Sequence, residues 1–358
     1  MGGGQSGLAA ARALLNTGLT PVVLEAGEQT AGSWPSYYDS LTLFSPARHS
    51  TLGAMPFPGS DDGEGDRYPH RDEVVAYLTR YADRLRADGA DIRTRTRVCA
   101  VESDGSGGFV AATADGRRLR TRGVVAASGS FANPHLPRLP GQESFTGRLS
   151  HVADYRNPAP YIGRRVIVVG AGNSAVQVGY ELAQVAAVTL ATRAPVAFLP
   201  QRVRGHDIHH WLAATGFDDL PPEWLAAMLG ATLVLDEGRY QNALSSEAMR
   251  RRPMFTAFTP EGVIWADGTH EPTDAVIFAT GYRPNLDYLR PLGALDTDGA
   301  PRHAGGISTT HPGLVYVGLE FQRSFASNTL RGVTRDAEYV TGPLAAHVRN
   351  APAALFGP

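Results

Sequence analysis

The sequence is poor in cysteine. Its 358 residues include a single one, Cys99, which lies in the alternating segment TRVCAVES and is therefore expected to be a buried thiol in a β-strand. A disulfide reductase that works with two dinucleotides needs a redox-active pair of cysteines. One cysteine cannot supply that pair, so electrons carried by this chain would have to leave by another route.

Long apolar runs and an excess of charge of one sign are also absent. No run reaches the roughly 18 apolar residues of a membrane-spanning helix, and the N-terminus does not follow the pattern of a secretory signal. We therefore expect a cytoplasmic protein. The formal net charge is −2, which favours neither nucleic acid nor an anionic membrane as a partner. A hydrophobic fraction of 43% is ordinary for a globular protein.

A glycine-rich loop opens the chain, and no strand precedes it. Gly2, Gly4 and Gly7 spell G-x-G-x-x-G before a predicted helix, and such a loop normally joins a strand to a helix and holds a dinucleotide pyrophosphate. Glu25 ends the next predicted strand, where a carboxylate would accept hydrogen bonds from a ribose. A sheet without its central strand would leave unpaired backbone groups, so we expect about five to ten more Val/Ile-rich residues upstream.

A second glycine loop lies in the middle of the chain, and there the strand before it is present. Gly170 and Gly172 form the turn, and Ala175 takes the third position, where a small residue is allowed. The following strand ends in Arg193 rather than in an acid. An arginine at that place favours a 2′-phosphate, and so NADPH over NADH. The alternative is that Arg193 is simply a solvated strand end.

The remaining segments differ in how clearly they can be interpreted. A helix should follow His70 and end near Gly89, and the Asp115-Gly116 pair predicts a hairpin. His206 and His210 would be neighbours on a helix. They lie near no cysteine and in no H-E-x-x-H pattern, so no metal site is expected.

Five motifs together resemble those of the class B flavin-dependent monooxygenases, and the resemblance covers nearly the whole chain. GGGQSG and GAGNSA look like the FAD and NADPH loops, while ASGSFANPHLP and ATGYRPN look like the two linkers between domains. FTGRLSHVADY fits the family fingerprint F-x-G-x-x-x-H-x-x-x-Y at every fixed position. The fingerprint ends in a tyrosine followed by Arg156, an ending that is similar to that of N- and S-oxygenating members. Baeyer-Villiger members more often end in tryptophan-proline.

The resemblance implies an α/β fold with two Rossmann-like domains, the first strand of the FAD domain being missing. The NADPH domain, residues 158–278, would be inserted into a discontinuous FAD domain, residues 1–157 and 279–358. It also implies oxygenation of a small molecule with NADPH and O2 through a peroxyflavin. An oxidase or reductase without a stable oxygen adduct, and a relic unable to hold FAD, remain alternatives. A homodimer is an open alternative to a monomer.

The family pattern also implies site residues. Trp34 could equally be core packing, and Asn173 and Ser174 could equally be helix caps. The residues implied for FAD are Gly2, Gly4, Gln5, Ser6, Gly7, Glu25, Ser33, Trp34, Val98, Gly129, Gly281 and Gly318. Those implied for NADPH are Gly170, Gly172, Asn173, Ser174, Ala175 and Arg193, with Arg202 and Arg204 as second candidates for the 2′-phosphate.

The chain departs from the family at one polar position. Animal and yeast members carry an asparagine near the oxygen adduct, and its place here falls at about Phe44. Ser45, His49 and Asn328 are the candidates to replace that amide as a hydrogen-bond donor. The alternative for Ser45 is an ordinary turn residue.

Overall fold

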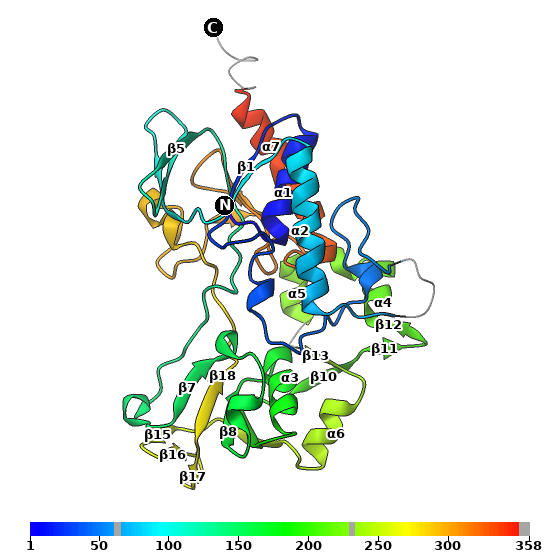
Figure 1. Cartoon of the computed structure of the whole chain (residues 1–358), viewed down its shortest axis with the longest axis vertical. Helices are drawn as coiled ribbons and strands as arrows, with labels where there is room; N and C mark the ends of the chain where they lie inside the picture. The colour runs from blue at the N-terminus through cyan, green and yellow to red at the C-terminus, as the bar shows by residue number, and fades with distance from the viewer. Residues whose placement is uncertain (61–65, 229–232, 351–358) are drawn as a thin grey trace.

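The structure is a computed structural model that describes residues 1–60, 66–228 and 233–350. It has two lobes, one above the other in Figure 1, and the chain crosses between them at residues 127–135 and again at 279–285. The upper lobe is built from both ends of the chain, and the lower lobe from its middle. The expected insertion of one α/β unit into another is therefore confirmed.

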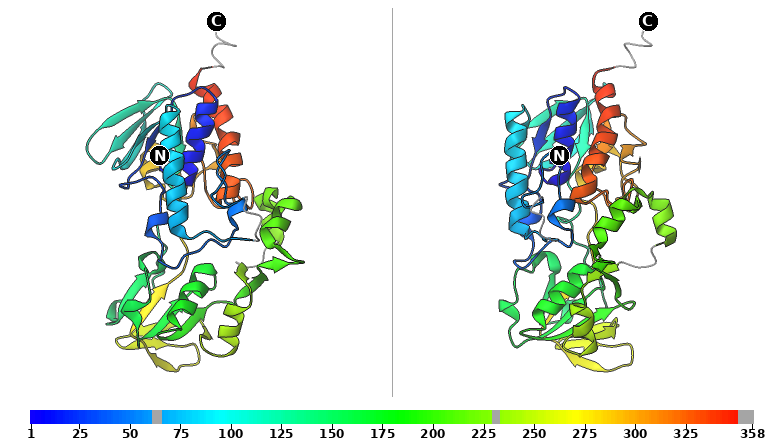
Figure 2. Two further views of the ribbon diagram at one scale, coloured as in Figure 1. Left: turned by 45° about the vertical axis from the view of Figure 1, so that its right-hand side comes forward. Right: turned by 90° about the vertical axis from the view of Figure 1, so that its right-hand side faces the viewer.

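Three helices cover one side of the upper lobe. They are α1 (Gln5–Asn16), α2 (Arg71–Ala87) and α7 (Leu330–Val348), and α1 packs against both of the others (Figure 2). Their apolar faces meet in a core that includes Leu8, Leu78 and Val333, all fully buried. Helix α2 is the one expected after His70, whose ring and Glu73 cap its N-terminus in a reciprocal pair of hydrogen bonds.

The strands of the upper lobe form three separate sheets. A parallel pair joins β1 (Val22–Leu24) to β2 (Asp91–Arg93). A meander holds β3 (Val98–Ser103), β4 (Phe109–Thr113) and β5 (Arg118–Thr121), with the predicted Asp115-Gly116 turn. The third sheet has the order β19 (His303–Ala304), β20 (Ile307–Ser308), β21 (Leu314–Tyr316), β6 (Val124–Ala126).

The lower lobe is organised around a five-stranded parallel sheet with the order β14-β9-β8-β18-β7. Helix α3 (Asn173–Leu182) crosses from β8 to β9, as in a dinucleotide-binding unit. The strands of this five-stranded sheet are β7 (Arg148–His151), β8 (Arg165–Val169), β9 (Ala187–Thr192), β14 (Arg250–Pro253) and β18 (Ala275–Phe278). A small antiparallel sheet flanks it: β15 (Ala257–Thr259), β16 (Gly262–Ile264) and β17 (His270–Pro272).

A segment between β9 and β14 reaches up to the first lobe (Figure 2). Asp218 from this segment receives two hydrogen bonds from the Arg331 guanidinium of α7, at 2.7 and 2.8 Å, and both side chains are nearly buried. The segment comprises β10 (Ala197–Pro200), β11 (Arg202–Val203), β12 (His206–Asp207), α4 (Ile208–Ala214), α5 (Pro222–Met228), β13 (Leu233–Asp236) and α6 (Arg239–Ser245).

Two expectations differ from the structure. Cys99 is exposed, so the prediction of a buried thiol was wrong. The register of β3 shifts between Val98 and Ala100, and an irregularity of that kind turns the intervening side chain to the other face. Strand β7 pairs with β18 in the lower sheet, although the expected boundary at residue 157 had counted it with the first lobe.

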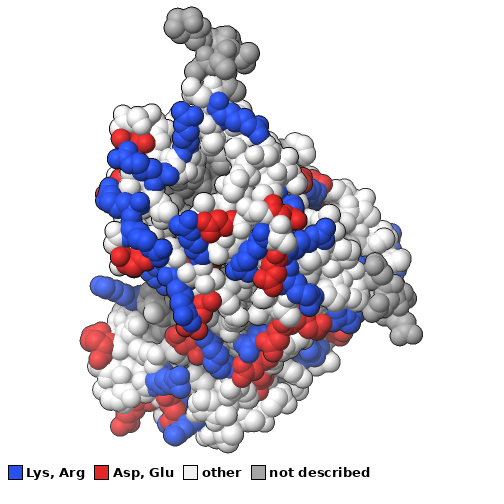
Figure 3. Space-filling view, turned by 45° about the horizontal axis from the view of Figure 1, so that its top comes forward, with Lys and Arg blue, Asp and Glu red and all other residues white. Residues whose placement is uncertain are grey.

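The face shown in Figure 3 carries basic and acidic side chains interspersed. The sequence contains no lysine, so every basic group drawn there is an arginine. No helix within the described ranges is long and apolar enough to cross a bilayer.

Candidate functional site

The first glycine loop leaves no room for side chains. Gly2 has a φ of +103°, and a Cβ on Gly2 would lie 2.3 Å from the carbonyl oxygen of Ala127. A Cβ on Gly7 would lie 1.8 Å from the carbonyl oxygen of Gly2. Gly4 is the N-cap of α1. Close approach of loop, helix and strand therefore requires glycine here, which is what a backbone-lined phosphate cradle needs.

Glu25 lies beside this loop, at the carboxyl end of β1. Its carboxylate accepts hydrogen bonds from the backbone N–H of Gly3 at 2.5 Å and of Gly27 at 2.6 Å, and the residue is buried. The sequence predicts that the carboxylate of Glu25 accepts hydrogen bonds from a ribose. In the structure its two carboxylate oxygens accept from the backbone N–H groups of Gly3 and Gly27, and its contact with a ribose stays a prediction.

Gln5 links three separate stretches of the chain. Its amide nitrogen donates to the backbone carbonyl of Asn328 at 2.8 Å, and its amide oxygen accepts from the Trp34 indole N–H at 3.2 Å. Trp34 packs at the edge of the upper core and contacts Tyr37, with ring centroids 5.5 Å apart. Trp34 is therefore a packing residue that also donates a hydrogen bond to Gln5, and its place beside the flavin stays a prediction.

Other predicted residues lie around the same loop. A Cβ on Gly318 would lie 2.0 Å from the hydroxyl of Ser6, so the last strand's end and α1 approach closely. Ser33 precedes the short 3₁₀ helix η1 (Trp34–Ser36) without capping it. Val98 lies farther along, at the start of β3 and beside the third core cluster. The backbone N–H of Thr96, two residues before it, donates to the carbonyl of Glu25 at 2.8 Å.

The second glycine loop repeats the arrangement in the lower lobe. Gly170 has a φ of +143°, and a Cβ there would lie 2.5 Å from the Ala279 carbonyl oxygen. Gly172 is the N-cap of α3, and Ala175 is buried against the loop. The side-chain oxygen of Asn173 is buried, and no hydrogen-bond partner for it is found in the described part of the chain. Neither Asn173 nor Ser174 caps the helix through its side chain, because the N-cap position belongs to Gly172.

Two arginines stand where β9 ends. Arg193 follows the strand directly and is exposed. Arg251, on the neighbouring strand β14, donates from Nε to the hydroxyl of Thr192 at 2.8 Å. Arg202 lies on β11 instead, paired with Asp66 at 2.7 Å. The structure therefore brings Arg251, which the sequence did not suggest, to the strand end and engages Arg202 elsewhere.

Two residues of the fingerprint motif make hydrogen bonds near the crossing between the lobes. The ring Nε2 of His151 lies 3.1 Å from the carbonyl oxygen of Gly281, and the Tyr155 hydroxyl donates to Glu181 on α3 at 2.8 Å. Gly129 and Gly281 sit in the two crossing segments with positive φ and open space where a Cβ would be. The crossings also bind each other, since the N–H of Asn285 donates to the Gly129 carbonyl at 2.8 Å.

The three polar candidates for the reaction centre differ in the hydrogen bonds that their side chains already make. The Ser45 hydroxyl lies 3.1 Å from that of Ser50, which itself donates to a backbone carbonyl, so Ser45 is already engaged. The Nε2 of His49 is buried without a hydrogen-bond partner among the described residues. Burial, and then the neighbouring His209, lower the pKa of His49 to about 4, so its ring is neutral at pH 7. Asn328 is half-buried, and its backbone carbonyl accepts from Gln5, while no hydrogen bond of its side chain is found among the described residues.

A buried polar cluster between the lobes was missed by sequence reasoning. The Asp207 carboxylate lies 2.7 Å from the Nδ1 of His209, and it accepts from the Tyr68 hydroxyl and the Gln201 amide, each at 2.6 Å. Burial raises the pKa of Asp207, but these donors outweigh it and lower the pKa to about 2. The sequence drew attention to His206 and His210, whose rings stack 4.3 Å apart, while the cluster uses the histidine between them. No metal-binding group is found within the described residues.

Comparison with known proteins gives consistent matches. The profile of the pyridine nucleotide-disulphide oxidoreductase family matches residues 1–214. Indole-3-pyruvate monooxygenase YUCCA4 of Oryza sativa subsp. japonica is 31% identical, over 95% of this chain and 85% of that protein. The uncharacterized oxidoreductase CzcO of Bacillus subtilis (strain 168) is 26% identical, over 95% and 96%. The solved flavin-containing monooxygenase from Stenotrophomonas maltophilia matches with a TM-score of 0.80 and 32% identity, over 99% of this chain and 97% of that one.

The chain belongs to the pyridine nucleotide-disulphide oxidoreductase family. Within it, the chain is a class B flavin-dependent monooxygenase, an oxidoreductase with sites for a flavin and a pyridine nucleotide. The resemblance found in the sequence is thereby confirmed. The family name mentions a disulfide, but the single Cys99 leaves no pair for that chemistry.

Proposed function

We propose that the chain is an FAD enzyme that uses NADPH and O2 to oxygenate a small molecule at nitrogen, sulfur or a similar centre. The observation that carries the proposal is the pair of glycine cradles, one in each lobe, joined by a junction that the fingerprint residues fasten. Steric demand at Gly2, Gly7 and Gly170 supports both cradles, because side chains there would collide with backbone.

Each cradle would hold one cofactor through backbone and a few side chains. In the upper lobe, residues 2–7 would approach the FAD pyrophosphate, Glu25 would accept from the ribose, and Gln5 would hold Trp34 and the 323–329 loop at the flavin end. The chemistry that the two cofactors supply when bound is hydride transfer followed by oxygen activation. The protein's own part is to bind them, to orient them and to keep water away.

NADPH is favoured over NADH by the charge at the end of β9. Arg193 is exposed there, and Arg251 is fixed beside it through Thr192. Since the sequence has no lysine, arginine is the only side chain permanently positive at pH 7 that could pair with a 2′-phosphate. Arg193→Ala should therefore raise the KM for NADPH much more than that for NADH, while Arg202→Ala should change neither.

Asn328 is the donor that we assign to the oxygen-reacting centre. Its side chain has no hydrogen bond within the described residues, and its backbone is held by Gln5 at the same place as Trp34. His49 is the second candidate, since its buried Nε2 has no partner within the described residues. Ser45 is disfavoured by its contact with Ser50.

An oxidase that releases hydrogen peroxide is the second candidate function. It is favoured by the loss of the asparagine that animal and yeast members of the family carry, since its place here falls at about Phe44, which is exposed. The residues that would hold FAD and NADPH would then serve a reaction in which electrons from NADPH reduce oxygen to hydrogen peroxide and no oxygen atom enters a substrate. The two candidates differ in how much peroxide forms per NADPH consumed.

The deciding experiment records the flavin spectrum after NADPH is added to the FAD-loaded protein in aerated buffer. A spectrum that differs for a long time from that of oxidised flavin before the oxidised spectrum returns would support a monooxygenase. Immediate return of the oxidised spectrum, with one hydrogen peroxide formed per NADPH, would support the oxidase. Amines, sulfides and ketones would then be screened, with indole-3-pyruvate included because the rice relative is named for it. Asn328→Ala and Ser45→Ala are the paired variants. A rise in peroxide per NADPH in the first alone is expected, and unchanged coupling in both would refute the assignment.

A further inference from the structure

Residues 197–214, from the segment between β9 and β14, pack against the loop of residues 44–50 in the upper lobe (Figure 2). The Phe44 ring stacks on the ring of His209, with centroids 5.9 Å apart and an angle of 23° between the ring planes. The ring of His49, on the same loop as Phe44, lies 6.1 Å from that of His209. Two histidines that are far apart in the sequence therefore lie side by side at this contact.

The Asp207 carboxylate determines which nitrogen of His209 carries hydrogen. Both residues are buried, with exposures of 0% and 1%. The carboxylate accepts from the Tyr68 hydroxyl, the Gln201 amide and the backbone N–H of His209, and with a pKa of about 2 it is ionised at pH 7. An ionised carboxylate has no hydrogen to donate, so the His209 Nδ1, 2.7 Å away, must donate to it. In the uncharged ring the Nε2 is then an acceptor, and no hydrogen bond to it is found among the described residues.

His49 offers a second nitrogen of the same kind. Its Nε2 is buried, and it has no hydrogen-bond partner within the described part of the chain. The pKa of this ring is about 4, so the ring is uncharged at pH 7, and in its Nε2–H form it donates where His209 accepts. Burying such a nitrogen without a hydrogen bond is unfavourable. A ligand that bonds to both nitrogens would remove that cost.

A hydroxyl group has the hydrogen-bonding capacity that this pair requires. It donates one hydrogen bond and also accepts, so a single hydroxyl can donate to the Nε2 of His209 and accept from the Nε2–H of His49. Two hydrogen bonds of about 2.8 Å that meet at one oxygen span at most about 5.6 Å. That length is comparable with the 6.1 Å between the ring centres. A methyl group in the same place forms neither bond.

The segment that carries His209 also contacts the loop of Asn328. Its Asp218 accepts two hydrogen bonds from Arg331, and the backbone carbonyl of Asp218 accepts from the N–H of Ala326 at 3.4 Å. Asn328 lies between these two contacts in the sequence. The histidine pair is therefore close in the fold to the loop that we assign to the oxygen-reacting centre.

We propose that His209 and His49 bind a hydroxyl group of the substrate, and that Asp207 is the positioning residue that orients His209. The inference rests on the proposed function and deepens it by naming the substrate class: a small molecule with an apolar body and a hydroxyl group. The apolar body lies against the ring of Phe44, which is exposed. Specificity comes from the hydroxyl, because a molecule that lacks it leaves two buried nitrogens unpaired.

The test compares hydroxyethyl phenyl sulfide with phenyl propyl sulfide, which differ by a hydroxyl in place of a methyl group. Dissociation constants are measured on the FAD-loaded protein without NADPH. The hydroxyl compound should bind at least about 100-fold more tightly. Hydroxypropyl phenyl sulfide and butyl phenyl sulfide repeat the comparison with a longer spacer. An affinity ratio near one in both pairs, or no measurable binding of any of the four compounds, would overturn the proposal.

Three variants test whether the histidine pair is the origin of this affinity ratio. His49→Phe keeps a ring and removes a nitrogen that bonds to no described residue, and it should lower the ratio at least about tenfold. Asp207→Asn should also lower the ratio, and in turnover its effect should fall on KM rather than on kcat. His206→Phe is the matched control, because His206 is an exposed histidine that stacks on His210 outside the pair, and it should leave the ratio unchanged. A His49→Phe variant that binds both compounds more weakly by the same factor would contradict the proposal.

Turnover with NADPH and oxygen separates this proposal from the proposed function. Peroxide release without any sulfoxide, together with the high affinity ratio, would refute oxygenation and support the hydroxyl site. Sulfoxide formed equally well from the hydroxyl and the methyl compounds, with equal affinities, would support oxygenation and refute the hydroxyl site.

Discussion

The amino group of Met1 offers a quantitative test of the structure, because burial lowers its pKa from 8.0 to about 6 although the Glu25 carboxylate opposes the shift. In the unfolded chain the amine has its ordinary pKa, so between pH 6 and 8 the unfolded state binds more protons than the folded state. The free energy of unfolding therefore rises with pH across that window. The lowered pKa corresponds to a free energy of unfolding of about 3 kcal/mol, which is lost below pH 6 and recovered above pH 8.

The perturbation is acetylation, and the sequence makes it selective. In a chain that begins at Met1 and contains no lysine, the Met1 amine is the one primary amine available to an amine-directed acetylating reagent. Urea unfolding of the acetylated and unmodified chains, with Met1 confirmed by mass, would be compared from pH 5.5 to pH 9. The difference in unfolding free energy between them should be about 3 kcal/mol more favourable to the acetylated chain at the acid end than at the alkaline end. A difference that stays constant within about 0.5 kcal/mol would refute the burial of this amine.

Two further predictions use matched pairs of substitutions. In a urea titration, Gly7→Ala should destabilise the fold by about 1–3 kcal/mol or more and release flavin, because the added Cβ would collide with the Gly2 carbonyl. Gly342→Ala adds a Cβ in open space within α7, and it should stabilise the fold by about 0.5–1 kcal/mol. Arg331→Met should cost about 3–5 kcal/mol because it strands a buried carboxylate, whereas Arg335→Gln breaks a solvent-exposed pair and should stay within about 1 kcal/mol. Equal effects within either pair would contradict the burial described.

Local rules predicted the parts of the site that are local in sequence. The glycine loops, the acid after β1 and the arginine after β9 each follow from what a tight strand-to-helix turn requires, and each lies where expected. The exposed Cys99 could not be foreseen, because a register shift in β3 reverses the alternation on which the prediction depended. The partners of Asp207 could not be foreseen either. Tyr68 lies 139 positions before Asp207, and no periodic pattern in the sequence predicts a contact between residues so far apart.

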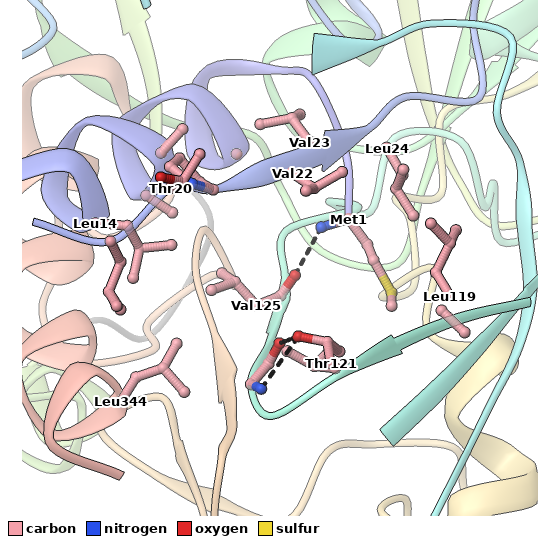
Figure 4. A pocket seen from close by; sticks show the side chains of 18 of the residues that line it. Met1, Leu14, Thr20, Val22, Val23, Leu24, Leu119, Thr121, Val125 and Leu344 are labelled. Atoms are coloured by element: carbon pink, nitrogen blue, oxygen red, sulfur yellow. Dashed lines mark hydrogen bonds between the residues drawn. The ribbon is translucent and has the colours of Figure 1, made fainter. Parts of the chain in front are cut away.

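A short piece of chain joins Met1 to the candidate reaction centre. The amino group of Met1 donates to the carbonyl of Val125 (Figure 4), and Gln5, four positions on, contacts both Trp34 and the loop of Asn328. Between them Glu25 pins the N–H of Gly3. A displacement at Met1 must therefore be absorbed within a loop whose glycines have no free space, or be passed on to Gln5. Because the donor that we propose for the oxygen-reacting centre depends on that glutamine, Gln5→Ala should raise the peroxide released per NADPH even though Gln5 is not itself that donor.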